Sequence, residues 1–240
     1  MEQISILVAG DSAVTVEFGN CISPEINCRV TGFCESLKES RIKGVVEWVP
    51  TFRSVTVFYD PVRISFLKLS EKLQKLAGEM NVTRTGRKRV FYIPVCYEEE
   101  YGPDMCHVVE HTGLSRQTII DLHSGRDYLI YMLGFLPGFA YLGGMDERLR
   151  TPRLASPRTR IEAGSVGIGD LQTGIYPLSS PGGWQLIGRT PVRPFDERRQ
   201  KPILYDAGDY IRFVPISGRE YREIEIPCNA GNYKCRIEEI

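Results

Sequence analysis

The stretch ISILVAGDSAVTVEFG, residues 4–19, indicates how the chain begins to fold. It holds two β-prone runs separated by the turn-forming triplet Gly-Asp-Ser. The segment SPEINCRVTGFCESLKES, residues 23–40, then starts with a serine that can cap a helix and a proline that suits the first helical position. Four apolar residues recur along it at helical spacing, namely Ile26, Val30, Phe33 and Leu37. The chain therefore opens with two strands and a helix that buries one face.

The next segments continue this alternation of strands and helices. GVVEWVP (residues 44–50) and RSVTVFYD (residues 53–60) predict two strands, and RKRVFYIPV (residues 87–95) predicts another. Between them a second amphipathic helix is marked by Phe66, Leu69, Leu73 and Leu76. The order strand, helix, strand, strand, helix, strand is typical of the split βαβ, ferredoxin-like pattern. Residues 1–85 are therefore expected to form a small ferredoxin-like α+β domain.

The second part of the chain differs from the first in its glycine and proline content and in the length of its strand-like runs. Residues 102–125 predict two short helices, the second capped by Ser115. After them glycine and proline are frequent, and short strand-like runs such as DYLIYML, GSVGIG and DYIRFVPI lie between turn signals. Short strands bounded by turns favour a closed or nearly closed β-barrel. We expect residues 86–240 to form this second domain.

Composition narrows the class of protein. The 240 residues are 42% hydrophobic and 25% charged, with Lys plus Arg and Asp plus Glu at 30 each, so overall charge indicates neither a nucleic-acid partner nor an anionic membrane. The basic run RTGRKR, residues 84–89, is interpreted as a solvated linker. Charges interrupt the apolar N-terminal run, so neither a secretory signal nor a membrane span is expected. Seven cysteines without a C-x-x-C pair predict a reduced, cytoplasmic protein.

Common catalytic motifs are weak or missing. HVVEH, residues 107–111, matches a zinc-peptidase pattern, but no third ligand stands out, and a surface helix with polar residues is the competing interpretation. No phosphate-binding loop and no G-x-S-x-G motif is present. GSVGIGD (residues 164–170) is not followed by a helix-forming run, and Ser179 and Ser180 fit a turn better than a nucleophile.

Three loops of similar composition remain as a candidate site. They are GFLPGFAYLGG (residues 134–144), TPRLASPRTRIEAGSV (residues 151–166) and GIYPLSSPGGWQLIGRTP (residues 174–191). Glycines let backbone amides approach a ligand, aromatic rings can wall a pocket, and arginine can bind a carboxylate or phosphate. These loops favour a pocket for a small planar or anionic substrate. The alternative is that the glycines and prolines mark barrel corners and the aromatic rings are core.

In this order, GFLPGFAYLGG, PRLASPRTRIEAGSVGIG, TGIYPLSSPGGWQLIGRTP and YDAGDYIRF resemble the signature of the 5-oxoprolinase B-subunit family, also called the allophanate hydrolase subunit 1 or Kip kinase-inhibitor family. The segments GDSAVTVEFG, VFYDP and YGPDM also match, so the resemblance covers nearly the whole chain. It implies an N-terminal α+β domain followed by a C-terminal cyclophilin-like β-barrel.

The resemblance also implies a function. The chain would be a subunit that, with 5-oxoprolinase subunits A and C, opens the lactam of 5-oxo-L-proline to L-glutamate, driven by ATP hydrolysis. ATP, with Mg²⁺, would be a co-substrate of the complex, and no bound metal or organic cofactor is expected in this chain. Two alternatives stay open: inhibition of a sporulation histidine kinase, and a role with urea or allophanate. A stand-alone amidase is disfavoured because no set of nucleophile, base and orienting residue can be named.

The family motif assigns candidate site residues by position. Arg158 or Arg189 would pair with the substrate carboxylate or phosphorylated oxygen, and His123 would act as acid or base, the competing interpretation being a helix C-terminal histidine. The expected substrate-binding residues are Phe135, Pro137, Gly138, Phe139, Tyr141, Ser165, Tyr176, Ser180, Gly182, Gly183, Trp184 and Thr190. The motif also covers Gly134, Pro157, Gly164, Pro177 and Pro181. The sequence departs from the pattern at Glu162, where proline is usual, and at Asp170.

Overall fold

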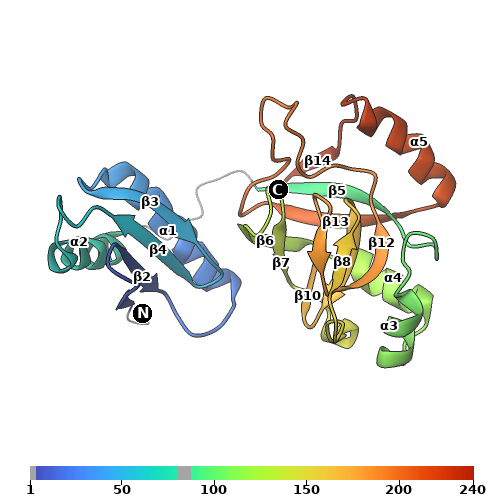
Figure 1. Ribbon diagram of the computed structural model, residues 1–240, viewed down its shortest axis with the longest axis horizontal. Coiled ribbons are helices and arrows are strands. Elements are labelled where there is room, and N and C mark those ends of the chain that lie inside the picture. The colour runs from blue at the N-terminus through green and yellow to red at the C-terminus, as the bar shows by residue number, and fades with distance from the viewer. Residues whose placement is uncertain (1–3, 81–87) are drawn as a thin grey trace. The chain divides into compact units, whose positions relative to one another are not determined.

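The computed structural model describes residues 4–80 and 88–240, and the chain divides into two compact units, residues 1–86 and 87–240 (Figure 1). Each unit has a hydrophobic core of its own. The expected boundary at residue 85, and most of the basic run at residues 84–89, lie outside the described residues. The helices of the described ranges include none long and apolar enough to cross a membrane.

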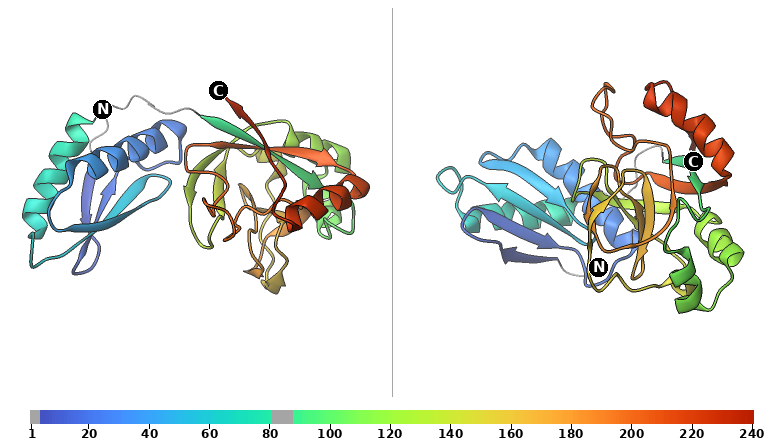
Figure 2. Two further views of the ribbon diagram at one scale, coloured as in Figure 1. Left: turned by 90° about the horizontal axis from the view of Figure 1, so that it is seen from above. Right: turned by 45° about the vertical axis from the view of Figure 1, so that its right-hand side comes forward.

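The first unit is a four-stranded antiparallel sheet in the order β1-β2-β4-β3, with two helices packed against one face (Figure 2). Its elements are β1 (Ser5–Val8), β2 (Ala13–Glu17), α1 (Pro24–Ser40), β3 (Val45–Pro50), β4 (Ser54–Tyr59) and α2 (Phe66–Glu79). Val14 and Val16 of β2 lie opposite Val57 and Val55 of β4, so all four valines reach the core on the same face. This face is the one that the helices cover.

Helix α1 confirms the capping and spacing that the sequence predicts. The Ser23 hydroxyl accepts a hydrogen bond from the Ile26 backbone N–H at 3.2 Å, and Pro24 is the first helical residue. The four residues predicted to share a buried face are all buried, namely Ile26, Val30, Phe33 and Leu37. Fully burying a side chain of the size of Phe33 or Leu37 contributes about 1.5–3 kcal/mol. The burial of this face therefore holds the helix on the sheet.

One strand of the expected ferredoxin-like order does not pair as expected. The run at residues 87–95 forms β5 (Arg89–Cys96), which belongs to the sheet of the second unit and not to the first. The place beside β2 is occupied by β1, which joins β2 through a short hairpin connection. Sequential strands linked by a tight turn pair more easily than strands separated by a long segment, so the hairpin takes this edge.

The second unit is built on a mainly antiparallel, nearly closed sheet. The strand order is β10-β9-β12-β5-β13-β6-β7, and β14 pairs with β5 outside this path. The end strands β10 and β7 contact each other, which brings the sheet close to a barrel. After β5 the elements are α3 (Met105–Thr112), α4 (Arg116–Ser124), β6 (Tyr128–Leu133), β7 (Ala140–Gly143), η1 (Glu147–Leu149), β8 (Arg158–Ile161), β9 (Ser165–Gly169), β10 (Gln172–Ile175), β11 (Ser180–Gly182), β12 (Gln185–Arg189), β13 (Tyr210–Ile216), α5 (Gly218–Asn229) and β14 (Arg236–Glu239).

Strand β5 is the centre of this sheet. It pairs in parallel with β13 from Val90 to Cys96, antiparallel with β14 near its start, and with β12 at Cys96. Because both faces of β5 are covered, its residues are almost all buried. The nearly closed barrel that the frequent turn signals predict is therefore present. Its central strand, β5, comes first in the sequence among the strands of this sheet.

Helix α5 is an element that the sequence interpretation did not include. Ser217 and Glu220 form a capping box: the Ser217 hydroxyl accepts from the Glu220 N–H, and the Glu220 carboxylate accepts from the Ser217 N–H. This S-x-x-E spacing is a recognised helix start, so the signal for α5 was present in the sequence. Ser115 caps α4 in the same way, as predicted, by accepting from the Thr118 N–H at 3.1 Å.

Candidate functional site

The loop GFLPGF, between β6 and β7, has a strained tip. The Leu136 N–H donates to the Gly134 carbonyl at 2.8 Å, and Phe135 between them has φ +67°. These features define a γ-turn of the positive-φ kind, which is rare and strained for a residue with a side chain. The Phe135 ring is nevertheless 64% exposed. A strained backbone that presents an exposed ring is typical of a functional loop.

The strain at Phe135 leads to a first prediction. Phe135→Gly should be more stable than Phe135→Ala by about 1 kcal/mol, because only glycine adopts this φ without a steric cost. Both variants lose the same ring contacts, so their difference isolates the backbone term, and chemical denaturation would measure it. At the neighbouring Leu136, which does not have positive φ, the same pair of substitutions should show alanine as the more stable. Equal stabilities at position 135 would contradict the strain.

Gly138 fixes the other end of this loop. Its carbonyl accepts a hydrogen bond from the buried Tyr205 hydroxyl at 2.9 Å. Its φ is +80°, and a Cβ there would lie 3.0 Å from the Cβ of Phe195. The loop therefore needs glycine at this point both for its conformation and for its close approach to the barrel.

Five of the sequence-predicted site residues form one aromatic cluster, defined as Phe135, Phe139, Tyr141, Tyr176 and Trp184. Phe139 is its centre: its ring centroid lies 5.5 Å from that of Phe135, 5.2 Å from that of Tyr141, and 5.7 Å from those of both Tyr176 and Trp184. All these pairs meet edge to face, the arrangement that aromatic quadrupoles favour. The structure thus brings together rings from two of the three predicted loops.

The third loop reaches the cluster through β8. Ile161 of β8 packs in the same buried group as Phe139, Tyr176 and Trp184. β8 pairs with β11, and a Cβ on Gly182 of β11 would come within 2.7 Å of Ile161 and 2.5 Å of the Tyr176 hydroxyl. Gly182 is therefore a spacer that admits the Tyr176 ring. Gly183 and Pro137 are on the connecting loops of the same region.

Arg158 is held by an ion pair. Its Nη2 donates to Asp104 Oδ1 at 2.6 Å, and its Nη1 donates to the Trp184 carbonyl at 3.3 Å. The second oxygen of Asp104 accepts from the Leu186 N–H at 2.6 Å. The two side chains are 31% and 12% exposed, so the pair is largely shielded from water. Asp104 was missed as a partner because, just before α3, it looks like an ordinary helix cap.

Arg189 lies in different surroundings. Its Nε donates to the Ala163 carbonyl at 3.1 Å, and no carboxylate within residues 4–80 and 88–240 forms an ion pair with it. It pairs in register with Ser165, and the Thr190 N–H donates to the Gly164 carbonyl at 2.9 Å. Ser165 and Thr190 are buried. Arg189 is therefore a half-buried cation whose side chain can still accept an anionic partner.

Backbone hydrogen bonds connect Arg189 to the aromatic cluster. The Tyr176 N–H donates to the Ser165 carbonyl at 2.9 Å, and the Gly164 N–H donates to the Tyr176 carbonyl at 2.7 Å. The residue that carries one cluster ring is thus bonded on both sides to the segment that packs on Arg189. These backbone hydrogen bonds therefore connect the position of the Tyr176 ring to that of the Arg189 side chain.

Two buried polar groups near the cluster have no partner. Ser180 Oγ, at the start of β11, and Gln185 Oε1, at the start of β12, form no hydrogen bond to any described residue. The side chains are 9% and 2% exposed, and Gln185 Nε2 already donates to the Pro152 carbonyl at 2.9 Å. An unpaired buried polar atom costs about 1–3 kcal/mol, so such atoms in a native fold call for an explanation such as a ligand. Gln185 was not singled out from the sequence, although it adjoins Trp184.

His123 is fully buried in the barrel core, stacked on Phe213 with ring centroids 4.4 Å apart. Thr173 Oγ1 donates to the Gly167 carbonyl at 3.0 Å, so it accepts from His123 Nε2–H at 2.8 Å. His123 Nδ1 is then the acceptor for the Tyr97 hydroxyl at 2.7 Å. Burial lowers the pKa of His123 from 6.5 to about 3. The ring is therefore neutral at pH 7, with both nitrogens in hydrogen bonds.

This burial gives a second prediction. As the pH falls from 6.5 towards 3, the second unit should lose stability by up to about 1.4 kcal/mol per pH unit, because the unfolded chain binds a proton that folded His123 does not. The free energy of unfolding, measured by denaturant at several pH values, should show this slope in the wild type and lose it in His123→Gln. His107→Gln, which changes an exposed ring, should keep the slope. Identical slopes in all three proteins would contradict a neutral, buried His123.

The two other motifs considered from the sequence do not gather ligands. His107 and His111 stack at 6.4 Å on an exposed face of α3, and the described residues contain no group of three or more His, Cys, Asp or Glu side chains placed to hold a metal ion. The GSVGIGD segment forms the antiparallel hairpin of β9 and β10, without a helix N-terminus that could receive a phosphate.

The family of this chain follows from comparison with known proteins. The family model of the carboxyltransferase domain, subdomain C and D, matches residues 4–205. Two curated relatives are named as the B subunit of 5-oxoprolinase. The Bacillus subtilis protein is 42% identical, with 88% of this chain and 92% of that protein covered. The Escherichia coli O157:H7 protein is 40% identical, with 90% and 97% covered. The chain belongs to the 5-oxoprolinase B-subunit family.

A solved structure supports the fold. The structure of TTHA0988 superimposes with a TM-score of 0.75 at 36% identity, covering 86% of this chain and 40% of that longer chain. The two-unit α+β architecture with a barrel-like sheet is therefore shared with an experimentally determined protein.

Proposed function

We propose that this chain acts as one subunit of an ATP-dependent 5-oxoprolinase that, with subunits A and C, converts 5-oxo-L-proline to L-glutamate. The proposal is supported by the 40–42% identity, over most of both chains, to proteins that are named as the B subunit of 5-oxoprolinase. ATP, with Mg²⁺, is the proposed co-substrate of the complex. A cytoplasmic location is proposed with it, since the chain has seven cysteines and no C-x-x-C pair.

The hydrolysis of the 5-oxoproline lactam determines which groups a binding site must provide. The lactam of 5-oxoproline is an unstrained amide, so water attacks it at neutral pH only after the carbonyl oxygen has been activated. Phosphoryl transfer from ATP to that oxygen provides the activation; one water then adds to the carbon, and the ring C–N bond breaks as the nitrogen takes up a proton and becomes the free amine. A second water hydrolyses the resulting acyl phosphate to L-glutamate and phosphate. The proteins must hold a small flat ring, its carboxylate, and the growing charge on oxygen.

A local observation supports the proposal: Ser180 Oγ, on the residue that pairs with Ile161 of β8, and Gln185 Oε1, on the residue after Trp184, are buried and have no partner among the described residues. An amide ring presents one N–H donor and one carbonyl acceptor, which a hydroxyl and an amide oxygen can satisfy. The rings of the cluster would wall the pocket, and Arg189 would bind the carboxylate or the phosphorylated oxygen. Arg158, already paired with Asp104, would position the Trp184 backbone.

For His123 we propose a positioning role in place of proton transfer. Its Nε2 holds Thr173 of β10, and its Nδ1 holds Tyr97 after β5, so it joins two strands of the barrel. Either nitrogen would have to break a buried hydrogen bond to exchange a proton with substrate. The remaining predicted contacts, among them Ser165 and Thr190, would shape the Arg189 side of the pocket.

We propose further that residues 1–85 are a ferredoxin-like variant and residues 86–240 a cyclophilin-like barrel. The order β2-β4-β3 with α1 and α2 on one face supports the first, with β1 replacing the last strand. The contact between β7 and β10 that nearly closes the second sheet supports the other.

The test is reconstitution of the complex. This chain mixed with purified subunits A and C should form glutamate from 5-oxoproline only with ATP, and leaving out this chain should abolish the product. Each component omitted in turn is the control. Glutamate formed without this chain, or no product from three folded proteins, would overturn the proposal. Conversion of urea by the same mixture would assign the urea-related chemistry instead, and inhibition of a histidine kinase by the isolated chain stays a separate prediction for an autophosphorylation assay.

A further inference from the structure

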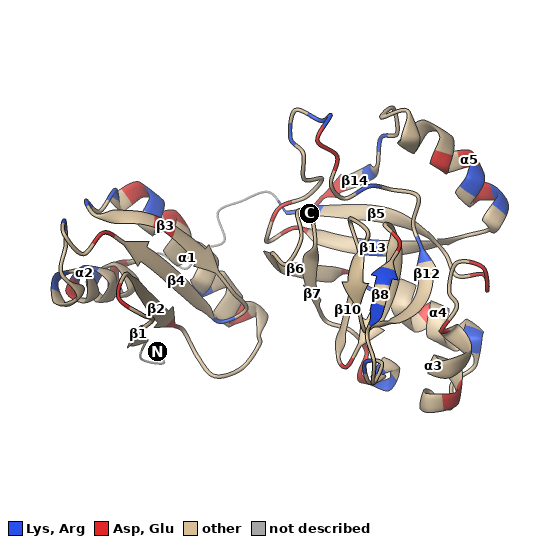
Figure 3. Ribbon diagram, in the orientation of Figure 1, with Lys and Arg blue, Asp and Glu red and all other residues tan. Residues whose placement is uncertain are grey.

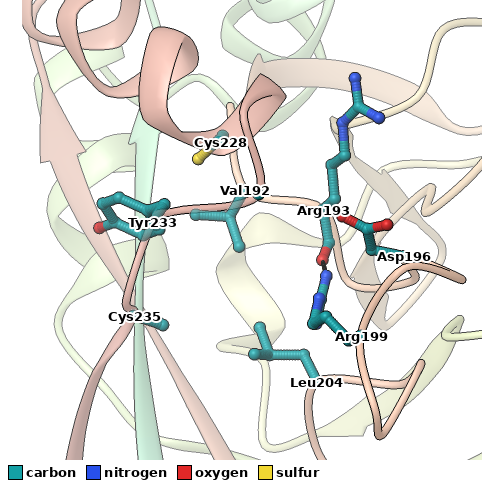
Figure 4. Close-up of a pocket in the computed structure, with 9 residues that line it drawn as sticks. Val192, Arg193, Asp196, Arg199, Leu204, Cys228, Tyr233 and Cys235 are labelled. Atoms are coloured by element: carbon teal, nitrogen blue, oxygen red, sulfur yellow. Dashed lines mark hydrogen bonds between the residues drawn. The ribbon is translucent and has the colours of Figure 1, made fainter.

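A pocket with basic side chains in its lining lies in the second unit (Figure 4). The segment between β12 and β13 and the segment that follows α5 enclose a volume of about 70 Å³. None of the aromatic-cluster residues lines it. The apolar part of its lining includes Val192 and Leu204, and the positively charged part includes Arg193 and Arg199. Figure 3 shows both basic and acidic positions on the segment between β12 and β13.

Arg199 has an unpaired donor in this pocket. One of its nitrogens, Nη2, donates to the Arg193 carbonyl, as the dashed line in Figure 4 marks. Its other terminal nitrogen, Nη1, is buried and has no hydrogen-bond partner among the described residues. Burial lowers the pKa of Arg199 from its usual value, yet a guanidinium stays charged at neutral pH. The pocket therefore contains a cation with an unsatisfied N–H group.

The carboxylate in the pocket, Asp196, attracts Arg199 electrostatically but forms its side-chain hydrogen bonds with Arg198. Both oxygens of Asp196 accept hydrogen bonds from the Arg198 side chain, at 2.8 and 2.7 Å, and one also accepts from the Arg198 N–H. These bonds lower the pKa of Asp196, and the positive charge of Arg199 lowers it further. Arg193 and Arg199 remain as two positive charges without a carboxylate at hydrogen-bond distance in the described structure.

The two cysteines of the pocket do not supply negative charge either. Burial raises the pKa of Cys228 to about 11 and that of Cys235 to about 12. Both thiols are therefore protonated at pH 7. Glu225 of α5 is near Cys228 but does not line the pocket.

We propose that this pocket binds a small oxyanion, a phosphate or a carboxylate. Arg199 Nη1 donates to the anion from the buried side, whereas the exposed guanidinium of Arg193, which donates to Asn229 Oδ1 at 2.7 Å, extends away from Arg199 (Figure 4) and adds only positive charge at the rim. Val192 and Leu204 limit the ligand to about the size of one such group. The inference rests on this pocket alone and does not depend on the proposed 5-oxoprolinase activity.

Calorimetric titration of the full chain tests the site. Inorganic phosphate and acetate are the two probes, and chloride keeps the ionic strength constant. We expect saturable binding of at least one of them, which identifies the class of oxyanion. Arg199→Met should weaken that binding about tenfold or more, and Arg199→Lys should keep part of it. Arg219→Met, which changes an arginine side chain 85% exposed on α5, should bind like the wild type.

The melting temperature measured without phosphate or acetate distinguishes a ligand-binding role of Arg199 from a purely structural one. Arg199→Met removes a buried donor that has no partner among the described residues, but also the hydrogen bond from Nη2 to the Arg193 carbonyl. These two effects oppose each other, so its melting temperature in chloride alone should stay close to that of the wild type. Leu204→Phe is a second variant that keeps both arginines and fills the pocket, and it should also lose binding. Lack of saturable binding by either anion, or unchanged binding in both Arg199→Met and Leu204→Phe, would overturn the site. A lower melting temperature of Arg199→Met in chloride together with unchanged binding would likewise assign Arg199 to structure alone.

Discussion

Phe139→Ala is expected to lower the free energy of unfolding of the second unit by about 3–5 kcal/mol, the usual cost of removing a buried phenylalanine. Phe139 is 3% exposed and contacts Phe135, Tyr141, Tyr176 and Trp184 edge to face. Its removal takes away the ring contacts that Phe135 and Tyr141 make with it and opens a cavity that these rigid side chains cannot fill.

The measurement needs a signal from the second unit alone. Trp48 lies in the first unit and Trp184 in the second, so a Trp48→Phe background makes tryptophan fluorescence report only the unit that contains Phe139. Denaturant unfolding in this background gives the difference in free energy. Phe135→Ala is the control, because an exposed ring should contribute less than about 1 kcal/mol beyond its backbone effect. A loss below about 1 kcal/mol for Phe139→Ala would show that the cluster does not support the fold.

Arg189→Met is expected to lower kcat/KM of the reconstituted complex about 100-fold, and Arg189→Lys about 10-fold. Methionine removes both the positive charge and the paired N–H donors of the guanidinium, whereas lysine keeps the charge but loses the bidentate geometry. Stability should change little, because within the described residues the side chain forms one hydrogen bond, to the Ala163 carbonyl, and no ion pair.

The comparison with Arg158 makes this prediction specific. Arg158→Met leaves the largely buried Asp104 without its cation, so it should lower the melting temperature as well as activity. Arg189→Met should lower activity alone, as judged by steady-state kinetics and thermal unfolding of the same samples. Arg219→Met serves as the exposed control. Full activity of Arg189→Met, with the chain folded and assembled, would remove Arg189 from the site.

Local signals in the sequence predicted local structure well. Ser23 and Pro24 mark the start of α1, and the spacing of Val30, Phe33 and Leu37 marks its buried face, because caps and periodicity act within a few residues. The capping box of Ser217 and Glu220 is a local signal of the same kind, although the sequence interpretation did not use it to predict α5.

The pairing of strands that lie far apart in the sequence could not be predicted in the same way. β5 looks like any strand of alternating or continuous apolar residues, and its sequence does not show that it pairs with β13 in place of β2. The choice depends on how whole segments pack, which no short window contains. The site shows the same division: the aromatic rings and Arg189 stand out by residue type, whereas the burial of His123 and the bond from Arg158 to Asp104 depend on contacts across the barrel.

The central position of β5 has a consequence for how the protein is synthesised. Translation delivers β5 before every other strand of its sheet, yet its long parallel partner, β13, is complete only when residue 216 has been added. Until then the nascent chain carries an apolar strand without its β13 and β14 partners, and its open hydrogen-bonding groups can pair with other chains. The barrel must therefore close after most of the chain has left the ribosome, and we expect the yield of folded protein to depend on protection of this strand during that interval.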